Sequence, residues 1–267
     1  MDSISLGRWD WLLLSVAIAT LGALVQWVIE HQAESPRPSE SGSRWRTLDS
    51  IITHPWFAQP LRALYTIGVP AFAFLANGAL TARGLGLKPL PFWRAQSGPG
   101  DAIPAYATGG WLSDLGWFAL LTSATLVVVA IGNHNARSRL IATGDQRGPR
   151  SIARAALDAV VYQVHWAFYR EPWVVLWGIA AGSWLGTLPI LTETALNLVF
   201  WERLRSGDVL YTRRLLIRGG VLIATTQLYL KTQNLWLAVL LDLAIGWLMI
   251  QQPRSHSVTR EAITTTR

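Results

Sequence analysis

The sequence predicts an all-α protein, a polytopic bundle of about seven transmembrane helices. Of its 267 residues, 51% are hydrophobic and only 15% are charged, whereas soluble domains carry about 25% charged residues. The apolar residues gather in blocks of roughly 20, the length that a helix needs to cross a hydrocarbon core about 30 Å thick. Because polar and Arg-rich segments separate these blocks, we expect an integral membrane protein.

Seven apolar blocks are the expected spans. The first is longer than the hydrophobic core of a signal peptide, so we expect it to be retained as a helix. The second contains Gly68 and Pro70, which membrane helices tolerate when neighbours satisfy the freed carbonyl. The fourth is less apolar, and Pro172 marks the break after it, because the residue before a proline disfavours the helical region. We expect the fifth to be kinked at Pro189. The blocks are residues 11–29, 61–82, 111–131, 152–169, 173–200, 215–230 and 235–250.

Two Arg-rich loops, residues 133–154 and 202–218, set the expected orientation. In membrane proteins Arg and Lys gather in cytoplasmic loops. Seven spans with the amino terminus outside place both loops and the polar tail, residues 252–267, on the cytoplasmic side of a bacterial inner membrane. Six spans, with residues 152–169 lying in the interface, would put the two loops on opposite sides. In the seven-span arrangement the Gly- and Pro-rich loop 83–110 lies outside.

The composition excludes several chemistries. The chain has no Cys, which rules out disulfides, thiolate catalysis and Cys-ligated metal. Its net charge of +7 forms no basic and aromatic stripe on a soluble element, so we expect no nucleic-acid binding. Only His165 of the five His residues lies at membrane depth, so neither paired haem ligands nor a helical zinc-peptidase pair is present. No cofactor is implied, although His165 could ligate the magnesium of one chlorophyll.

Ionisable residues lie inside the apolar blocks, where they are costly. Arg154, Asp158, Tyr162 and His165 are spaced four, four and three residues apart, which places them on one face of a helix. Such a face is expected to point into the bundle or into a water-filled cavity, and not into lipid.

Glu193 and Asp242 raise the same question further along the chain. A charged side chain at the middle of a membrane helix costs about 2.5–3.5 kcal/mol on insertion scales, so each carboxylate needs a partner, a proton or a cavity. Candidate partners are His165, Arg170 and Arg218. Three interpretations stay open: an interior salt bridge that fixes helix packing, a catalytic or ion-pathway role, and a role in binding a partner.

The stretch 228–248, "LYLKTQNLWLAVLLDLAIGWL", contains a helix ending in Leu-Tyr, a basic-Thr turn, Leu-Trp and a second helix. It resembles the last conserved block of the CPBP family, the CAAX-protease and bacteriocin-processing intramembrane peptidases. In that family the second helix bears a catalytic His, with Asn or Asp four residues later. The corresponding positions here are Asp242 and Gly246.

The stretch 165–170, "HWAFYR", is similar to the first CPBP motif, which is a Glu-Glu pair, three residues and Arg. Arg170 and the aromatic before it, Tyr169, are kept, but His165 and Trp166 replace the Glu pair. The second motif, Phe with His four residues on, falls at Trp184 and Leu188.

The resemblance covers roughly residues 150–250, and it implies a CPBP-like helical core. The family uses its Glu pair and two His to activate a water, or to bind a metal, for peptide cleavage. Because these groups are all replaced, the resemblance implies a pseudoprotease. The positions of the degenerate site are His165, Trp166, Arg170, Leu188 and Asp242.

The predicted organisation has three parts: residues 1–150 with three spans, a CPBP-like core of residues 151–251, and the tail 252–267. We expect polar side chains of the core to form an interior network. Its predicted members are Arg154, Asp158, Tyr162, His165, Arg170, Glu193 and Asp242.

The leading functional hypothesis is a catalytically inactive CPBP-like scaffold, which binds a partner or serves as an accessory subunit of a membrane complex. Its partners would be the lipid bilayer and other membrane subunits. One alternative is an intramembrane endopeptidase with shifted groups, in which His165 and Asp242 exchange roles. Another is a pigment- or lipid-contacting subunit of a respiratory or photosynthetic complex, with His165 as the pigment ligand.

Overall fold

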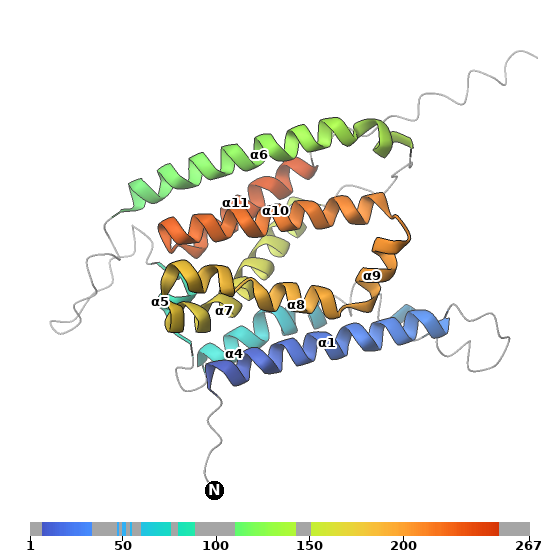
Figure 1. The fold of residues 1–267 in the computed structure, drawn as a ribbon, viewed down its shortest axis with the longest axis horizontal. Helices are drawn as coiled ribbons and strands as arrows, with labels where there is room; N and C mark the ends of the chain where they lie inside the picture. Colours follow the sequence, from blue (N-terminus) through green and yellow to red (C-terminus); the bar gives the residue numbers. More distant parts are fainter. Residues whose placement is uncertain are drawn as a thin grey trace, which may run out of the picture.

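The regular elements of the computed structural model are all helices in the part of the chain that it describes (Figure 1). Two of them are long and apolar enough to cross a membrane, α1 (Arg8–Ala33) and α6 (Trp111–Ala142). The bent pair α7 (Ile152–Leu185) and α8 (Leu188–Leu196) would be a third such span. The prediction of an all-helical chain with membrane-spanning segments is thus confirmed at this level. The described residues are 7–33, 47, 50–51, 54, 60–75, 80–88, 110–142 and 151–250.

Shorter elements complete the fold. They are the π-helical turn η1 (Leu64–Gly68), α4 (Val69–Leu75), α5 (Ala82–Leu85), α9 (Leu198–Arg205), α10 (Val209–Thr232) and α11 (Leu235–Ile250). Two expected Arg-rich loops are partly helical, because α6 continues to Ala142 and α10 begins at Val209. The Asp208 carboxylate accepts a hydrogen bond from the Tyr211 N–H at 3.0 Å and so caps the start of α10. The expected tail 252–267 lies outside the described residues.

The expected helix break at Pro172 is wrong, because α7 runs through this residue. Membrane helices accept an internal proline when their surroundings satisfy the freed carbonyl. The chain departs from helical geometry at Gly178 instead, where φ is 75° and ψ is 172°, a conformation that is essentially restricted to glycine. Pro189 lies in the first turn of α8, where proline is favoured, just after the bend between α7 and α8.

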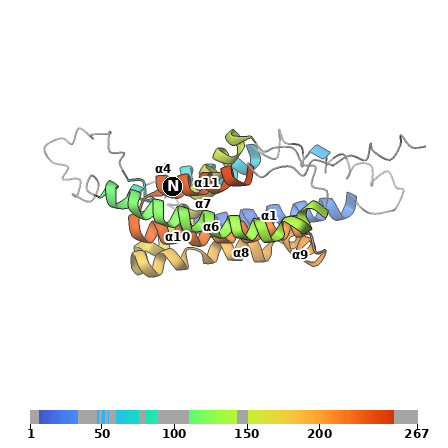
Figure 2. The ribbon, with the colours of Figure 1, turned by 90° about the horizontal axis from the view of Figure 1, so that it is seen from above.

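Helix α7 is the centre of the bundle, since it contacts α1, η1, α4, α5, α8, α10 and α11. Across Figure 1, α6, α10, α8 and α1 follow one another as a row of helices. Figure 2 shows α4, α7 and α11 on one side of this row. Every described helix therefore packs on, or one layer away from, the helix that carries the predicted polar face.

Two contacts define one end of the bundle, which we call the Glu171 end. Arg8 at the start of α1 approaches Glu171 of α7, with 3.5 Å between Nε and Oε2. The Leu235 N–H at the start of α11 donates to the Gly86 carbonyl at 2.8 Å, just after α5. The starts of α1 and α11 thus meet the α5 segment and the middle of α7.

The opposite end, which we call the basic end, is tied by contacts between other segments. The Trp27 indole N–H donates to the Glu202 carboxylate at 2.6 Å and so joins α1 to α9. The Arg213 guanidinium donates to the Asn133 side-chain oxygen at 2.9 and 2.6 Å, which joins α10 to α6. Exposed arginines gather around these contacts, namely Arg154, Arg203, Arg205 and Arg218.

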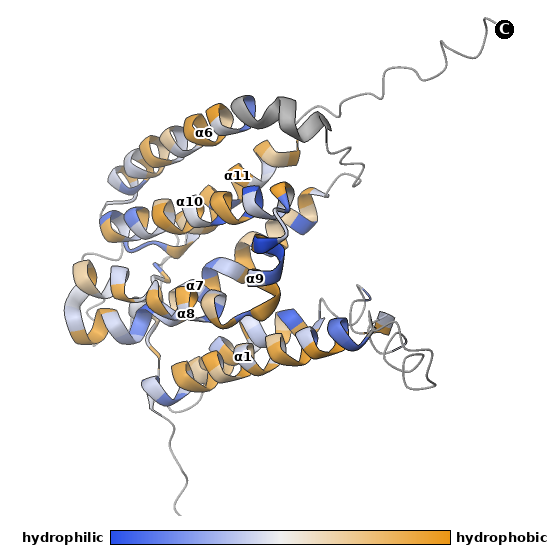
Figure 3. Cartoon of the chain, turned by 45° about the vertical axis from the view of Figure 1, so that its right-hand side comes forward, coloured by the Kyte–Doolittle hydropathy of each residue, from blue (hydrophilic) through white to orange (hydrophobic). Residues whose placement is uncertain are grey.

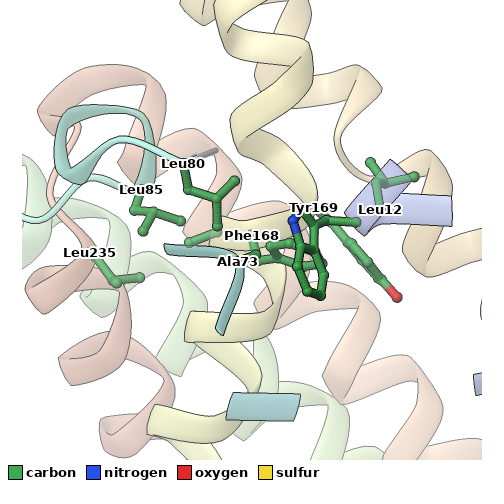
Figure 4. Close-up of a cluster of buried hydrophobic side chains, with 9 residues drawn as sticks. Leu12, Ala73, Leu80, Leu85, Phe168, Tyr169 and Leu235 are labelled. Atoms are coloured by element: carbon green, nitrogen blue, oxygen red, sulfur yellow. The ribbon is translucent and has the colours of Figure 1, made fainter. Parts of the chain in front are cut away.

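The interior is filled by two clusters of buried apolar side chains. Figure 4 shows members of the first, which come from α1, α4, the α5 segment, α7 and α11: Leu12, Ala73, Leu80, Leu85, Phe168, Tyr169 and Leu235. The second cluster joins Trp166 of α7 to Val221, Leu222 and Leu228 of α10 and to Leu241 of α11. These clusters hold α7 between the two halves of the bundle.

The outer helices turn large apolar side chains away from the protein. Along α1 and α6 the apolar residues are visible in Figure 3. Exposed examples are Leu13, Leu21, Leu112, Leu120 and Val128. Large exposed apolar surfaces mark contact with a membrane or a partner, so these two helices have the surface that a bilayer requires.

The segment after Gly178 packs back against the preceding part of α7 through two glycines. A Cβ at Gly182 would lie 2.4 Å from the Trp173 carbonyl oxygen, and one at Gly186 would lie 2.5 Å from the Arg170 Cα. Both neighbours are backbone atoms, which cannot move aside as a flexible side chain can. This close approach carries the chain into α8.

We predict that Gly186→Ala lowers the free energy of unfolding by about 1–3 kcal/mol, because the added methyl group overpacks a backbone contact. The measurement is reversible unfolding of the purified protein in mixed micelles. Gly220→Ala is the matched control, since no atom lies within 4 Å of a Cβ at this α10 position. The control should leave stability unchanged or raise it by about 0.5–1 kcal/mol. Equal effects of both substitutions would contradict the packing.

Candidate functional site

Five polar side chains from four segments meet in the interior, and we call them the Glu193 cluster. Its members are Ser15 of α1, Tyr65 of η1, His165 and Tyr169 of α7, and Glu193 of α8. Both tyrosine hydroxyls donate to the Glu193 Oε1, and they lie 2.9 Å from each other. The Ser15 hydroxyl lies 3.0 Å from the Tyr169 hydroxyl and 3.3 Å from the Tyr65 hydroxyl.

His165 completes the cluster on the other carboxylate oxygen. Its Nε2 lies 3.6 Å from the Glu193 Oε2 and 3.3 Å from the Tyr65 hydroxyl, whereas its buried Nδ1 has no hydrogen-bond partner among the described residues. Because the Tyr65 proton is committed to Glu193, we assign the ring proton to Nε2, which then faces acceptors. Both oxygens of Glu193 therefore face protein donors.

Local structure explains how these groups converge. His165 and Tyr169 are four residues apart on α7 and so lie on one helix face. Tyr65 lies in a π-helical turn, a feature that is frequent at functional sites. Glu193 reaches the cluster because α8 follows the Gly178 turn and packs against α1 and α7. Sequence reasoning did not predict three members of the cluster, since isolated hydroxyls in apolar blocks show no distinctive spacing. They are Ser15, Tyr65 and the hydroxyl of Tyr169, a residue noted only as the aromatic before Arg170.

Asp242, the other intramembrane carboxylate, has a separate partner. Its Oδ2 accepts a hydrogen bond from the Gln163 side-chain amide at 3.0 Å. Gln163 precedes His165 by two residues, so on a helix the two side chains project about 200° apart. Asp242 of α11 therefore meets α7 on a different side from the one that carries His165. The structure does not bring the two residues together as a catalytic couple.

The predicted polar face of α7 continues toward the basic end. The Asp158 carboxylate pairs with Arg62 at 3.0 Å. Tyr162 lies under two cations, with the guanidinium carbons of Arg62 and Arg218 each 4.6 Å from its ring centroid. Arg154, which the same spacing selected, is exposed at the start of α7.

Arg170, the residue kept from the first CPBP motif, is almost completely buried at 3% exposure. Its guanidinium carbon lies 4.2 Å from the ring centroid of Tyr229. Within the described residues no carboxylate pairs with it, since the neighbouring Glu171 approaches Arg8 and Thr81. A desolvated cation–π contact contributes about 2 kcal/mol, whereas burying a charge costs several kcal/mol. The ring alone does not offset the burial of this cation.

The other positions singled out by the resemblance have ordinary packing surroundings. Trp166 is buried in the second apolar cluster, whereas Trp184 and Leu188 are 41% and 45% exposed. A Cβ at Gly246 would lie 3.3 Å from the Ala155 Cβ, so α11 packs closely on α7 there.

A further buried ion pair, missed at the sequence level, lies near the Glu171 end. Lys88 donates to the Asp114 carboxylate at 2.8 Å, and the Asn234 side-chain amide lies 3.4 Å from the same oxygen. The Trp236 indole N–H donates to the Lys88 carbonyl at 2.9 Å. This pair fixes the segment after α5 to α6 and α11. Its partners are far apart in sequence, so no local pattern identifies them.

No group of three or more His, Asp or Glu side chains that could hold a metal ion occurs in the described part of the chain. Comparison of the chain with protein-family models, with curated proteins and with solved structures finds no match.

We predict that Tyr65→Phe and Glu193→Ala are strongly coupled, because each removes a partner of the other. Leaving a buried donor or acceptor unpaired costs about 1–3 kcal/mol. The double variant should therefore lose about 1–2 kcal/mol less than the sum of the single variants in a double-mutant cycle on unfolding free energy.

Tyr162→Phe serves as the control on the same face of α7. The guanidinium groups of Arg62 and Arg218 lie over the Tyr162 ring, and both contacts survive loss of the hydroxyl. This control should change the unfolding free energy by no more than about 0.5 kcal/mol. Additive single-variant effects for Tyr65 and Glu193 would show that the cluster is not a single hydrogen-bonded unit.

Proposed function

We propose that this chain is a seven-span membrane protein of the CPBP-like type that is catalytically inactive and acts as a partner-binding scaffold or accessory subunit. The observation that carries the proposal is the engagement of the Glu193 carboxylate by side chains of the same protein. A general base must have a lone pair within hydrogen-bond reach of the water that it activates. Two tyrosine hydroxyls donate to the Glu193 Oε1, and the His165 Nε2 lies 3.6 Å from Oε2, so protein groups face both oxygens.

The alternation of segments between the two ends of the bundle supports the seven spans. The segment with Arg62 and Tyr65, α7 and α10 run from the basic end to the Glu171 end. In the opposite direction run α1, α6, the α8–α9 segment and α11. The basic end carries the exposed arginines, which favours a cytoplasmic location for that end.

The topology can be tested by cysteine accessibility, because the chain has no Cys of its own. We expect Lys231→Cys and Leu112→Cys, at the Glu171 end, to react with a membrane-impermeant maleimide in intact cells. Arg154→Cys and Ser206→Cys, at the basic end, should react only after the membrane is permeabilised. The side chains at all four positions are exposed. Labelling of both groups from the same side would contradict the proposed topology.

The functional proposal predicts that the protein co-purifies with a stoichiometric membrane partner and cleaves no transmembrane peptide. The measurement is native mass spectrometry after gentle extraction, together with a cleavage assay on a reporter with a transmembrane segment. His165→Ala should reduce stability or assembly because it removes the ring that faces Tyr65 and Glu193. Asp242→Asn should do so because it keeps an acceptor for Gln163 but places an amide NH2 group where the carboxylate had only acceptors. Cleavage by the unaltered protein that both substitutions abolish would overturn the scaffold proposal.

A second candidate is an intramembrane endopeptidase centred on Glu193. The observation that favours it is the partly buried pairing of a carboxylate with His165 and two hydroxyl donors, which are residue types that general acid–base chemistry uses. Cleavage that is lost in Glu193→Gln but retained in Tyr162→Phe would support this candidate over the scaffold. A pigment-binding role would give the purified protein visible absorbance that disappears in His165→Ala.

A further inference from the structure

We propose that Arg170, Ser183 and Thr226 form a binding site for one anion of the phosphate class. The inference is independent of the scaffold proposal, because it rests on the unpaired state of these groups and not on the Glu193 cluster. Arg170 is always charged, it is 3% exposed, and its guanidinium carbon lies 4.2 Å from the centroid of the Tyr229 ring, with no carboxylate partner among the described residues. Buried guanidinium groups are normally paired with an anion.

Ser183 is the first additional donor. Its hydroxyl is fully buried and makes no hydrogen bond within the part of the chain that the structure describes. It lies one helical turn before Gly186, and a Cβ at Gly186 would be 3.1 Å from the Arg170 Cγ. The turn that carries Ser183 is therefore packed directly on the side chain of Arg170.

Thr226 is the second additional donor and belongs to α10, the helix whose Tyr229 ring lies against Arg170. It precedes Tyr229 by three residues, so the two are neighbours on the surface of α10. Its hydroxyl is also fully buried and has no partner. Other threonines of α10 bond to a carbonyl of the preceding turn, as Thr225 does to Val221 at 2.8 Å and Thr232 to Leu228 at 2.8 Å. The hydroxyl of Thr226 does not take this local partner and stays available to an acceptor.

An acceptor with several oxygens suits this arrangement. Arg offers a fork of donors that matches phosphate or carboxylate oxygens, and two hydroxyls can satisfy the remaining oxygens. Arg170 directly precedes Glu171, which pairs with Arg8 at the start of α1. The proposed site thus lies near an end of the bundle, within reach of either a phospholipid headgroup or a phosphate ion from solution.

The test uses the full-length protein in nanodiscs and measures its melting temperature by intrinsic fluorescence. One arm compares phosphatidylglycerol with phosphatidylcholine discs, and the other titrates inorganic phosphate into phosphatidylcholine discs. We expect at least one probe to raise the melting temperature of the unaltered protein. A response to phosphatidylglycerol alone identifies a lipid headgroup, and a saturable response to inorganic phosphate identifies a free ion.

Arg170→Gln should abolish the response, and Arg154→Gln, an exposed position, should leave it intact. Ser183→Ala and Thr226→Val keep Arg170 and should each weaken binding about tenfold, as expected for loss of one hydrogen bond to a charged group. If Arg170→Gln fails to fold, the responses of Ser183→Ala and Thr226→Val test whether the site binds the anion. The proposal is overturned if neither probe stabilises the unaltered protein, or if both hydroxyl variants respond as it does.

Discussion

A carboxylate inside an apolar helical bundle must be surrounded by hydrogen-bond donors, and Glu193 meets this requirement by drawing four segments together. Its two oxygens face Tyr65 of η1, Tyr169 and His165 of α7, while Ser15 of α1 bonds to the tyrosine hydroxyls. Of these segments only α7 is adjacent in sequence to α8, whereas α1 and η1 lie more than 100 residues earlier in the chain. The pairing of this carboxylate therefore acts together with the two apolar clusters in holding α1, η1 and α8 against α7.

The glycines that follow α7 make this arrangement possible. Gly178 adopts a conformation that other residues avoid, and Gly182 and Gly186 allow the returning segment to lie against the backbone of α7. Helix α8 then begins beside α7, and Glu193 falls at the level of His165 and Tyr169. The same close approach buries Arg170 beneath the turn. The close packing of these glycines on α7 thus positions both the Glu193 cluster and Arg170.

Much of the helical architecture could be predicted from sequence, because apolar blocks of membrane-spanning length are a strong local signal. The spacing of Asp158, Tyr162 and His165 also predicts their common helix face, which α7 presents. The proline rule failed at Pro172, since tertiary surroundings decide whether a proline breaks a membrane helix. Partners such as Gln163 for Asp242 could not be predicted, because pairing depends on how helices rotate against one another.

Glu193 ties four segments of the helical bundle together. The most direct test is amide hydrogen exchange of the full-length protein in lipid nanodiscs, with and without Glu193→Ala. We predict faster exchange in α8 and also in α1 and residues 60–75, because their shared hydrogen-bond acceptor is lost. Acceleration confined to α8 would contradict the account, since it would show that these segments are held together without the carboxylate.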